Sequence, residues 1–326
     1  MPIFSIVLLT QESATIEVKL MELKPQETTN TNPNINSNKA EKGNSPYRIA
    51  LKRFMKNKLA VASVFILLFI IVVVICAPLL TDHNPTKTNL TLIERPPSDD
   101  HILGNDSSGR DTFSRLLYGG RVSLIVGFSA MIFTLVIGVV LGSIAGYYGG
   151  KIDAIIMRAA DLMLMLPFLV LCLTIVAILE KVNIGIFVTI IALTSWPTLT
   201  RIIRGTFLTL REQEFILGAK AIGVSDMRII FKHFIPNAIG PIVVNATLMM
   251  ATYIIVESAL SFIGFGIPQP TPTWGNMISE AQSLRILRNN PETWIPPGLA
   301  ILTTVLCINF IGDGLRDAFD PKSNRR

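Results

Sequence analysis

The segment closest to a phosphate-binding loop is Gly146–Lys151, with the sequence GYYGGK. A Walker A loop needs a glycine five positions before its last glycine, and a Ser or Thr after the lysine. Ala145 and Ile152 occupy those two positions. The segment therefore lacks residues that a phosphate loop requires, and we interpret it as the glycine-rich end of a membrane span. We expect the chain itself to bind no nucleotide.

The histidines and cysteines show no recognisable catalytic or metal-binding pattern. The histidines are scattered over separate loops, and no nucleophile stands beside them in a known order: His83, His101 and His233. The cysteines each lie in an apolar run, which is typical of small buried hydrophobic residues: Cys76, Cys172 and Cys307. We predict no catalytic, cofactor-binding or metal-binding residue. An intramembrane enzyme stays an alternative, and it would need an inward-facing catalytic constellation.

Ionisable residues inside an apolar run would mark a proton or ion path. Glu257 is the main candidate, and it lies about 20 residues into its run, which is about 30 Å along a helix and near the outer membrane face. Two interpretations of Glu257 stay open, an interfacial acid and a gate-related residue. Asp161 and Asp313 fall near the opposite ends of their runs. The lack of a charge at mid-membrane argues against a channel or ion-driven carrier that works alone.

The elements that would position these residues are membrane helices. Half of the 326 residues are apolar and only 16% are charged, which is typical of a polytopic membrane protein. The net charge of +6 does not indicate nucleic-acid binding, because the basic residues flank apolar runs. We predict an all-α fold with six transmembrane helices, each near or above the roughly 20 residues that a bilayer requires. Their approximate ranges are 59–80, 122–148, 155–179, 182–203, 238–262 and 296–315.

Orientation follows from the distribution of Lys and Arg, which cluster before the first span, after the last, and in the loop between the fourth and fifth. This bias predicts that both termini are cytoplasmic. The segment 81–121 and the segment 264–295 are then external, with Trp274 and Trp294 as expected membrane-interface anchors. Asn-, Thr- and Ser-rich composition predicts a disordered tail over residues 1–46, and residues 1–20 are expected to come from an upstream start codon ahead of Met21. We divide the rest into a first span with its external loop (47–121), a core of five spans (122–316) and a cytoplasmic C-terminal tail (317–326).

The longest polar-containing interruption in the second half of the chain is the segment 212–237. Its pattern predicts two short amphipathic helices with a hinge at Gly223, where glycine can adopt the left-handed conformation. The first helix is expected to carry one apolar stripe, made of Phe215, Ile216, Ala219 and Ile222. Ser225 is the expected N-cap of the second helix, which is predicted to stop before Pro236.

This segment resembles the Glu-Ala-Ala loop of bacterial binding-protein-dependent ABC importer permeases. The positions of that motif are Leu217, Gly218 and Ala219, so that leucine stands where the family has glutamate, and Glu214 is a possible substitute. Three further stretches resemble the C-type subunit of dipeptide, oligopeptide and nickel importers: ILGNDSSGRDTFSRLLYGGRVSL at 102–124, ESALSFIGFGIPQPTPTWGNMISEA at 257–281 and PPGLAILTTVLCINFIGDGLRDAFDP at 296–321. The resemblance covers residues 46 to 321.

The resemblance implies a type I ABC importer permease fold in a bacterial plasma membrane. The implied partners are a second, B-type permease, two ATP-binding subunits, an extracellular substrate-binding lipoprotein and a peptide substrate, with nickel or a metal chelate as the alternative cargo. ATP hydrolysis is expected on the partners. The implied ATPase-coupling residues are Glu214, Leu217, Gly218, Ala219, Ile222 and Gly223.

Overall fold

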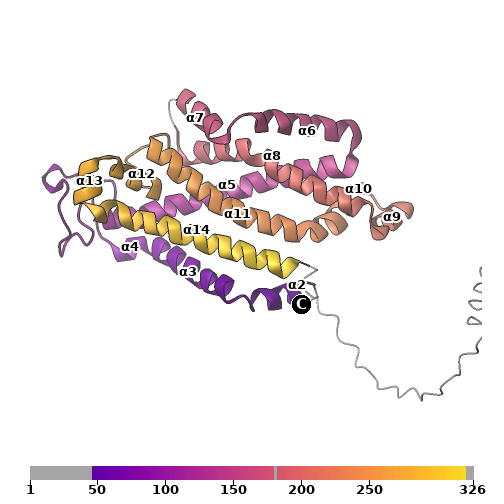
Figure 1. The fold of residues 1–326 in the computed structure, drawn as a ribbon, viewed down its shortest axis with the longest axis horizontal. Helices are drawn as coiled ribbons and strands as arrows, with labels where there is room; N and C mark the ends of the chain where they lie inside the picture. Colours follow the sequence, from indigo (N-terminus) through magenta and orange to yellow (C-terminus); the bar gives the residue numbers. More distant parts are fainter. Residues whose placement is uncertain (1–45, 180–181, 321–326) are drawn as a thin grey trace, which may run out of the picture. The chain divides into compact units, whose positions relative to one another are not determined.

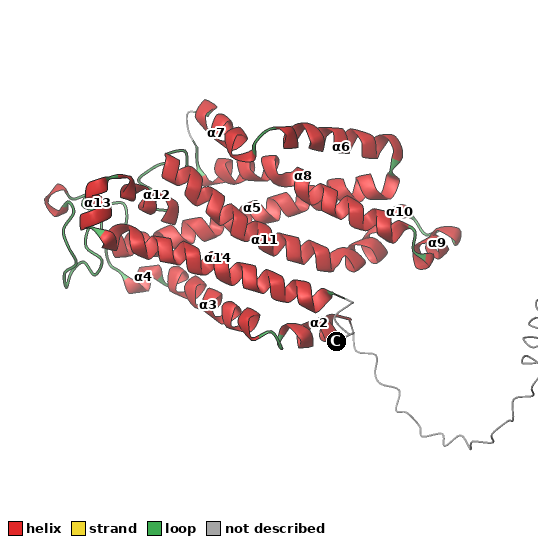
Figure 2. Ribbon diagram, in the orientation of Figure 1, coloured by secondary structure: helices red, strands yellow, loops and turns green. Residues whose placement is uncertain are grey.

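The computed structural model describes residues 46–179 and 182–320. Within these ranges the chain forms helices and loops, and one isolated β-bridge joins Asn105 to Asp111 without building a strand (Figure 2). The prediction of an all-α fold is confirmed. The predictions for residues 1–20, for the tail up to residue 45 and for residues 321–326 lie outside the described residues.

Five helices of the described chain are long and apolar enough to cross a bilayer. A bent pair raises the number to six if it counts as one span: α6 (Gly150–Met165) and α7 (Phe168–Ile178). The five are α3 (Lys58–Ile75), α5 (Thr112–Tyr148), α8 (Ile184–Arg211), α11 (Ile235–Ile263) together with the turns before it, and α14 (Pro291–Phe319).

The third predicted span, residues 155–179, is not a single kinked helix. Its two halves, α6 and α7, are bent by 83° at Leu166 and Pro167. Leu166 is extended, with φ −90° and ψ 132°, because a residue that precedes proline is pushed out of the helical region. By contrast, Pro197 lies inside α8 without ending it.

Several helix boundaries differ from the predicted spans. The first span ends at Ile75, and the short α4 (Ala77–Leu80) follows it with a proline in its first turn. The second begins at Thr112 rather than at residue 122, because the Asp111 side chain accepts a hydrogen bond from Ser114 N and caps the helix. The polar start of α5 therefore belongs to the helix.

The long helices pack into one bundle in the compact unit that comprises residues 45–326. Helix α5 packs against α8 and α11, and α14 packs against α11 and α3. Helices α9 (Glu214–Ala221) and α10 (Asp226–Ile229) lie at one end of the bundle (Figure 1). Helices α12 (Trp274–Ile278) and α13 (Leu284–Asn289) lie at the other end.

Three glycines spaced four apart bring α5 and α8 into close contact. A Cβ atom at Gly142 would lie 2.7 Å from Ile203 Cβ and 2.7 Å from Thr200 O. Gly138 and Gly146 face α8 in the same way, against Leu199 and Phe207. Such small-xxx-small stripes let membrane helices approach closely. The spacing is visible in the sequence, but Gly146 was interpreted there only as part of a glycine-rich helix end.

Trp274 is not a membrane-interface anchor. Its side chain is buried, and its indole Nε1 donates to Leu116 O at 3.0 Å. It packs in a core with Val74 and Ile254, which places α12 among the spans α3, α5 and α11. Trp294, in the first turns of α14, is partly exposed, and its role as an anchor stays a prediction.

Candidate functional site

Helix α9 forms the first half of the segment 212–237 and ends at a left-handed glycine. Gly223 has φ +76°, and the following Val224 N donates to Ala219 O at 3.1 Å. The Gly223 amide donates to Lys220 O at 3.0 Å. These bonds satisfy carbonyls that the helix end would leave without a partner. The predicted hinge at Gly223 is confirmed.

The inner face of α9 is held in a hydrophobic core of the same subunit. Ile216 and Ala219 are buried there together with three aromatic residues. These are Phe207 of α8, Tyr147 of α5, and Phe234, which directly precedes α11. The ring centroids of Phe207 and Phe234 lie 4.7 Å apart, and those of Tyr147 and Phe234 lie 5.5 Å apart. A displacement of α9 must therefore be transmitted to these packed neighbours, because a close-packed core does not deform freely.

The predicted single apolar stripe is wrong, because the structure divides it between two faces. Ile216 and Ala219 point inward, whereas Phe215 and Ile222 are exposed. Ala219 thus holds α9 on its own subunit rather than offering a contact to a partner. The exposed apolar residues of α9 and of its C-cap, which we name the outer face of α9, are Phe215, Leu217 and Ile222. Glu214 and Gly218 are exposed on α9 as well.

The second helix of the segment does not stop before Pro236. Helix α10 continues through a π-helical turn, η2 (Ile230–Phe234), directly into α11. Ile235 N donates to Ile230 O, five residues back, so the wider turn accommodates a proline that can donate no hydrogen bond. Because of this continuity, the second half of the polar segment, from Asp226 on, extends the fifth span.

Two polar contacts fasten the segment to the end of α5. Tyr147 Oη donates to Asp226 Oδ1 at 2.5 Å, and Lys220 Nζ lies 4.7 Å from the centroid of the Tyr147 ring. Ser225 occupies the N-cap position of α10, as predicted, but its side chain makes no capping hydrogen bond. Asp226 lies in the first turn, as expected, and is also a partner of α5.

Gly218, within α9, and Gly223, just after its end, allow a matched test of the helix end. An added Cβ would meet no atom within 4 Å at either Gly223 or Gly218, but only Gly223 has a positive φ. Gly223→Ala is expected to destabilise the turn by about 1–2 kcal/mol. Gly218→Ala is expected to stabilise the helix by about 0.5–1 kcal/mol. Hydrogen exchange of residues 214–224 should rise in the first variant and fall in the second; equal exchange in both would contradict the role of Gly223.

Glu257 is fully buried near the outer end of α11. Its carboxylate accepts hydrogen bonds from Ser261 Oγ at 2.8 Å and from Ser123 Oγ of α5 at 3.1 Å. Ser123 Oγ in turn accepts from Trp274 N at 3.2 Å. The carboxylate therefore links α11, α5 and α12, and it is not exposed as a surface acid would be. Its gate-related role stays a prediction.

A buried ion-pair cluster joins the segment 81–121 to the segment 264–295. Asp106 Oδ2 lies 2.6 Å from Arg110 Nε and 3.2 Å from Arg115 Nε, and all three side chains are at most 3% exposed. Glu280 of η3 (Ser279–Gln282) approaches Arg110 Nη2 at 3.7 Å and accepts from Ser107 N at 3.2 Å. We name Asp106, Arg110, Arg115 and Glu280 the outer ion cluster. No local sequence pattern indicates this cluster, because its two halves are far apart in the chain.

The outer ion cluster predicts a pH dependence of stability. Burial, followed by the charge of Asp106, raises the pKa of Glu280 from 4.5 to about 7. The folded state then binds more protons than the unfolded state between these values, so stability present at low pH is lost as the pH rises through about 7, by up to about 1.4 kcal/mol per pH unit. Glu280→Gln should flatten the thermal unfolding profile between pH 5 and about 8. An unchanged slope in that variant would contradict the assignment to Glu280.

A cavity of about 260 Å³ lies between the bend of α6 and α7, helix α8 and helix α11. Hydroxyl groups form its polar lining: Thr194, Ser195, Thr198, Thr252 and Tyr253. Thr198 and Thr252 are exposed although they lie in membrane spans. The Thr252 hydroxyl donates to Leu248 O at 3.0 Å within its own helix.

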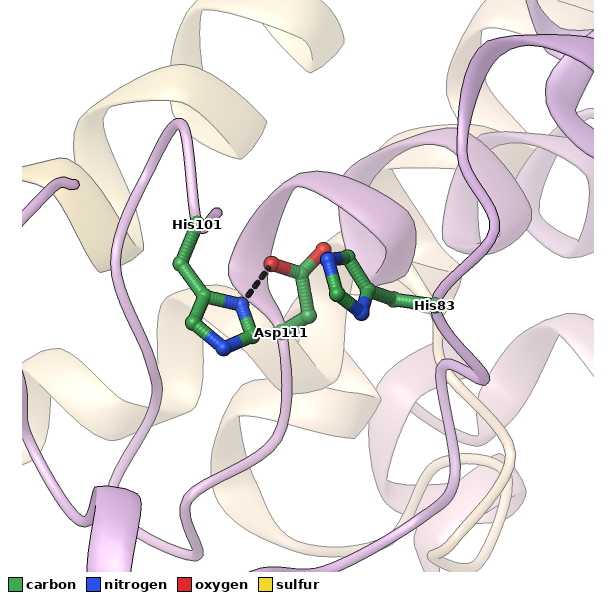
Figure 3. A group of neighbouring side chains, drawn as sticks. All are labelled: His83, His101 and Asp111. Carbon is green, nitrogen blue, oxygen red and sulfur yellow. Dashed lines mark hydrogen bonds and ion pairs between the residues drawn. The ribbon is translucent and has the colours of Figure 1, made fainter. Parts of the chain in front are cut away.

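The structure brings together two of the three histidines. The ring centroids of His83 and His101 lie 4.6 Å apart in the segment 81–121, whereas His233 lies in η2 at the other end of the bundle. The description of these histidines as scattered is therefore wrong for His83 and His101. Their common neighbour is Asp111, the N-cap of α5 (Figure 3).

Comparison with known proteins agrees with this architecture. Residues 138–325 match the family described as binding-protein-dependent transport system inner membrane component, and residues 45–97 match the N-terminal TM domain of oligopeptide transport permease C. The dipeptide transport system permease protein of Alkalihalophilus pseudofirmus is 44% identical over 278 residues, which are 85% of this chain and 90% of the relative. The oligopeptide transport system permease protein of Bacillus subtilis is 40% identical over 285 residues, 87% of this chain and 92% of the relative.

A solved structure of similar fold comes from a methionine ABC transporter in inward-facing conformations. It has a TM-score of 0.51 at 20% identity, and the match covers 64% of this chain and 97% of that chain. A bundle of apolar spans with a short helix held at one end defines a polytopic membrane protein. The chain belongs to the binding-protein-dependent transport system inner membrane component family, whose members are permease subunits of ABC importers. The resemblance seen in the sequence is confirmed.

Proposed function

We propose that this chain is the permease subunit through which an ATP-driven importer moves peptides. The observation that carries the proposal is α9, whose inner face is locked into the core of its own subunit while its outer face exposes apolar side chains. An exposed apolar patch of this kind marks a protein interaction site. The partner is an ATP-binding subunit, since the chain has no phosphate loop of its own.

The coupling assignment includes Glu214, Leu217, Gly218, Ala219, Ile222 and Gly223, with different roles. The exposed Leu217 and Ile222 contact the ATP-binding subunit, while exposed Gly218 lets the partner approach closely. Ala219 holds α9 inward, and Gly223 sets the helix end. Glu214 is exposed in the first turn of α9 and supplies a polar contact in place of the glutamate that the family has at position 217.

A movement of α9 is transmitted to the fourth and fifth spans. ATP-driven closure of the partner subunits pushes α9, and the core around Phe207 and Phe234 transmits the movement to α8 and α11. The hydroxyl-lined cavity between these helices is part of the peptide path, completed by a second, B-type permease. Neutral hydroxyls suit a peptide because they can form hydrogen bonds with it without binding its charged groups tightly.

We further propose that both termini are cytoplasmic. Helix α2 (Pro46–Phe54) and the C-terminal end of α14 lie toward the same end of the bundle as α9 (Figure 1). Arg53 Nη1 donates to Asp320 O at 2.9 Å, which ties the two ends of the described chain together. The distribution of Lys and Arg favours this end for the cytoplasm. The substrate-binding lipoprotein then delivers its cargo at the end that holds α12 and α13.

The test is uptake by proteoliposomes that contain this chain, its B-type partner and the two ATP-binding subunits, with the binding protein added outside. Labelled di- and oligopeptides should accumulate only with internal ATP, and vesicles with this chain alone should take up none. The names of the curated relatives favour peptides over nickel. ATP-independent uptake, or ATP-dependent accumulation of nickel without peptide, would overturn the proposal.

A further inference from the structure

Three potential metal ligands meet in the external segment, from parts of the chain that are distant in sequence. His83 follows α4, His101 lies in the loop that leads to α5, and Asp111 caps α5 (Figure 3). Each offers a ligand atom, and the three atoms lie within 4.8 Å of one another. Nitrogen and oxygen ligands about 2 Å from a zinc ion are roughly 3–3.5 Å apart in a tetrahedral site, so side-chain shifts of about an ångström would close the site.

His101 and Asp111 already face each other, so an ion bound by both would take the place of the proton between them. His101 Nδ1 lies 2.8 Å from Asp111 Oδ2, and His83 Nε2 lies 2.8 Å from Asp100 O. A carbonyl bonded to one ring nitrogen, as Asp100 O is to His83, fixes the orientation and tautomer of a metal-binding histidine and leaves its other nitrogen for the ion. The Asp111 carboxylate is itself fixed, because its Oδ1 accepts from Ser114 N at 2.7 Å.

A buried amide without partners independently indicates an occupant. Asn105 is 1% exposed, and neither its Oδ1 nor its Nδ2 has a hydrogen-bond partner in the structure. It lines a cavity of about 250 Å³ together with His83, His101 and Asp111. A buried polar group left without a partner costs about 1–3 kcal/mol. An ion that carries bound water would satisfy the amide from within this cavity.

The charge around the site favours a cation. A neighbouring cavity of about 290 Å³, which also contacts His83 and Asp111, is lined by three further carboxylates: Asp82, Asp99 and Asp100. Lys87 is the basic residue that lines the cavity on the Asn105 side. Two imidazoles with a carboxylate favour zinc and its transition-metal neighbours, since calcium and magnesium prefer oxygen ligands throughout.

We propose that His83, His101 and Asp111 bind one zinc-class divalent cation, with Asn105 bonded to the water that the ion carries. The ion is a resident of the permease and not its cargo. It joins the beginning, the middle and the end of the segment 81–111, and so it holds this segment against the N-terminus of α5. The site lies at the end of the bundle opposite α9.

The experiment uses the assembled transporter in detergent, stripped with a chelator and dialysed against micromolar Zn²⁺. The variants are His83→Ala and His101→Ala, with His233→Ala as the matched control at the other end of the bundle. Metal analysis should show one Zn²⁺ fewer per chain in either of the first two variants than in the wild type or the control. The apparent affinity of this site should fall more than tenfold in each.

A second measurement keeps the result independent of folding. Co²⁺ in place of Zn²⁺ should give visible absorption bands that both His83→Ala and His101→Ala remove, while all proteins keep the same elution profile on gel filtration. Excess Ca²⁺ or Mg²⁺ should not displace the Co²⁺. Equal Zn²⁺ content in the wild type and in either His→Ala variant, or displacement by Ca²⁺, would overturn the proposal.

Discussion

Ile222→Asp is expected to lower ATP-driven uptake by more than about tenfold while leaving the permease folded. Ile222 is 81% exposed at the end of α9, so the substitution removes no contact within the subunit. In the assembled transporter the new carboxylate would be buried against the ATP-binding subunit without a partner. Truncation of a central interface residue typically costs about 2–4 kcal/mol, and about 1.4 kcal/mol is a tenfold change in affinity. Uptake by proteoliposomes and thermal unfolding of the purified complex measure the two effects.

Two further variants separate docking from folding. Ile152→Asp makes the same change at a half-exposed residue of α6, outside the outer face of α9, and uptake should persist. Ile216→Ala empties part of the core beneath α9, and it should lower the unfolding temperature as well as uptake, because such truncations cost about 2–5 kcal/mol. Normal uptake by Ile222→Asp would show that the outer face of α9 does not contact the ATP-binding subunit.

The segment 212–237 shows where local sequence signals suffice. Gly223 ends a helix because glycine alone adopts its positive φ without strain, and the sequence predicted that end correctly. The structure leaves Phe215 and Ile222 exposed and buries Ile216 and Ala219. Which apolar residues are buried depends on the neighbours that cover the helix, and an apolar pattern does not contain that information. The π-helical turn before Pro236 was not predicted either, because proline normally signals a helix boundary.

The spans were predictable because their apolar length is a property of each segment alone. The prediction failed at the polar start of α5, where Asp111 caps the helix ahead of its apolar run, and at Pro167, where the extended Leu166 breaks the span. The outer ion cluster and the pairing of His83 with His101 unite residues from distant segments. Gly138, Gly142 and Gly146 are different, because their spacing of four residues is a local pattern that indicates close helix packing.

Asp106→Ala is expected to be the most destabilising single change in the outer ion cluster. It removes the carboxylate that contacts both Arg110 and Arg115, and it leaves these guanidinium groups buried with Glu280 as their remaining acidic neighbour. Breaking a buried ion pair by removing one partner costs about 3–5 kcal/mol. A change of that size should lower the unfolding temperature by about 6–20 °C. Asp99→Ala, at an exposed position of the segment 81–121, is the matched control and should stay close to the wild type.

Asp106→Asn keeps the backbone hydrogen bonds of Asp106 and removes its ion pairs. The Asp106 Oδ1 atom accepts from Ser108 N and Arg110 N, both at 2.9 Å, and an asparagine oxygen can keep both bonds. Asparagine removes the Oδ2 acceptor of Arg110 Nε and the negative charge that helps to raise the pKa of Glu280. The pKa of Glu280 should therefore fall in this variant, and the pH range over which stability is lost should move below about 7. If Asp106→Asn unfolds at the wild-type temperature and keeps the wild-type pH profile, the two carboxylates do not share the arginines, and the cluster is a set of independent contacts.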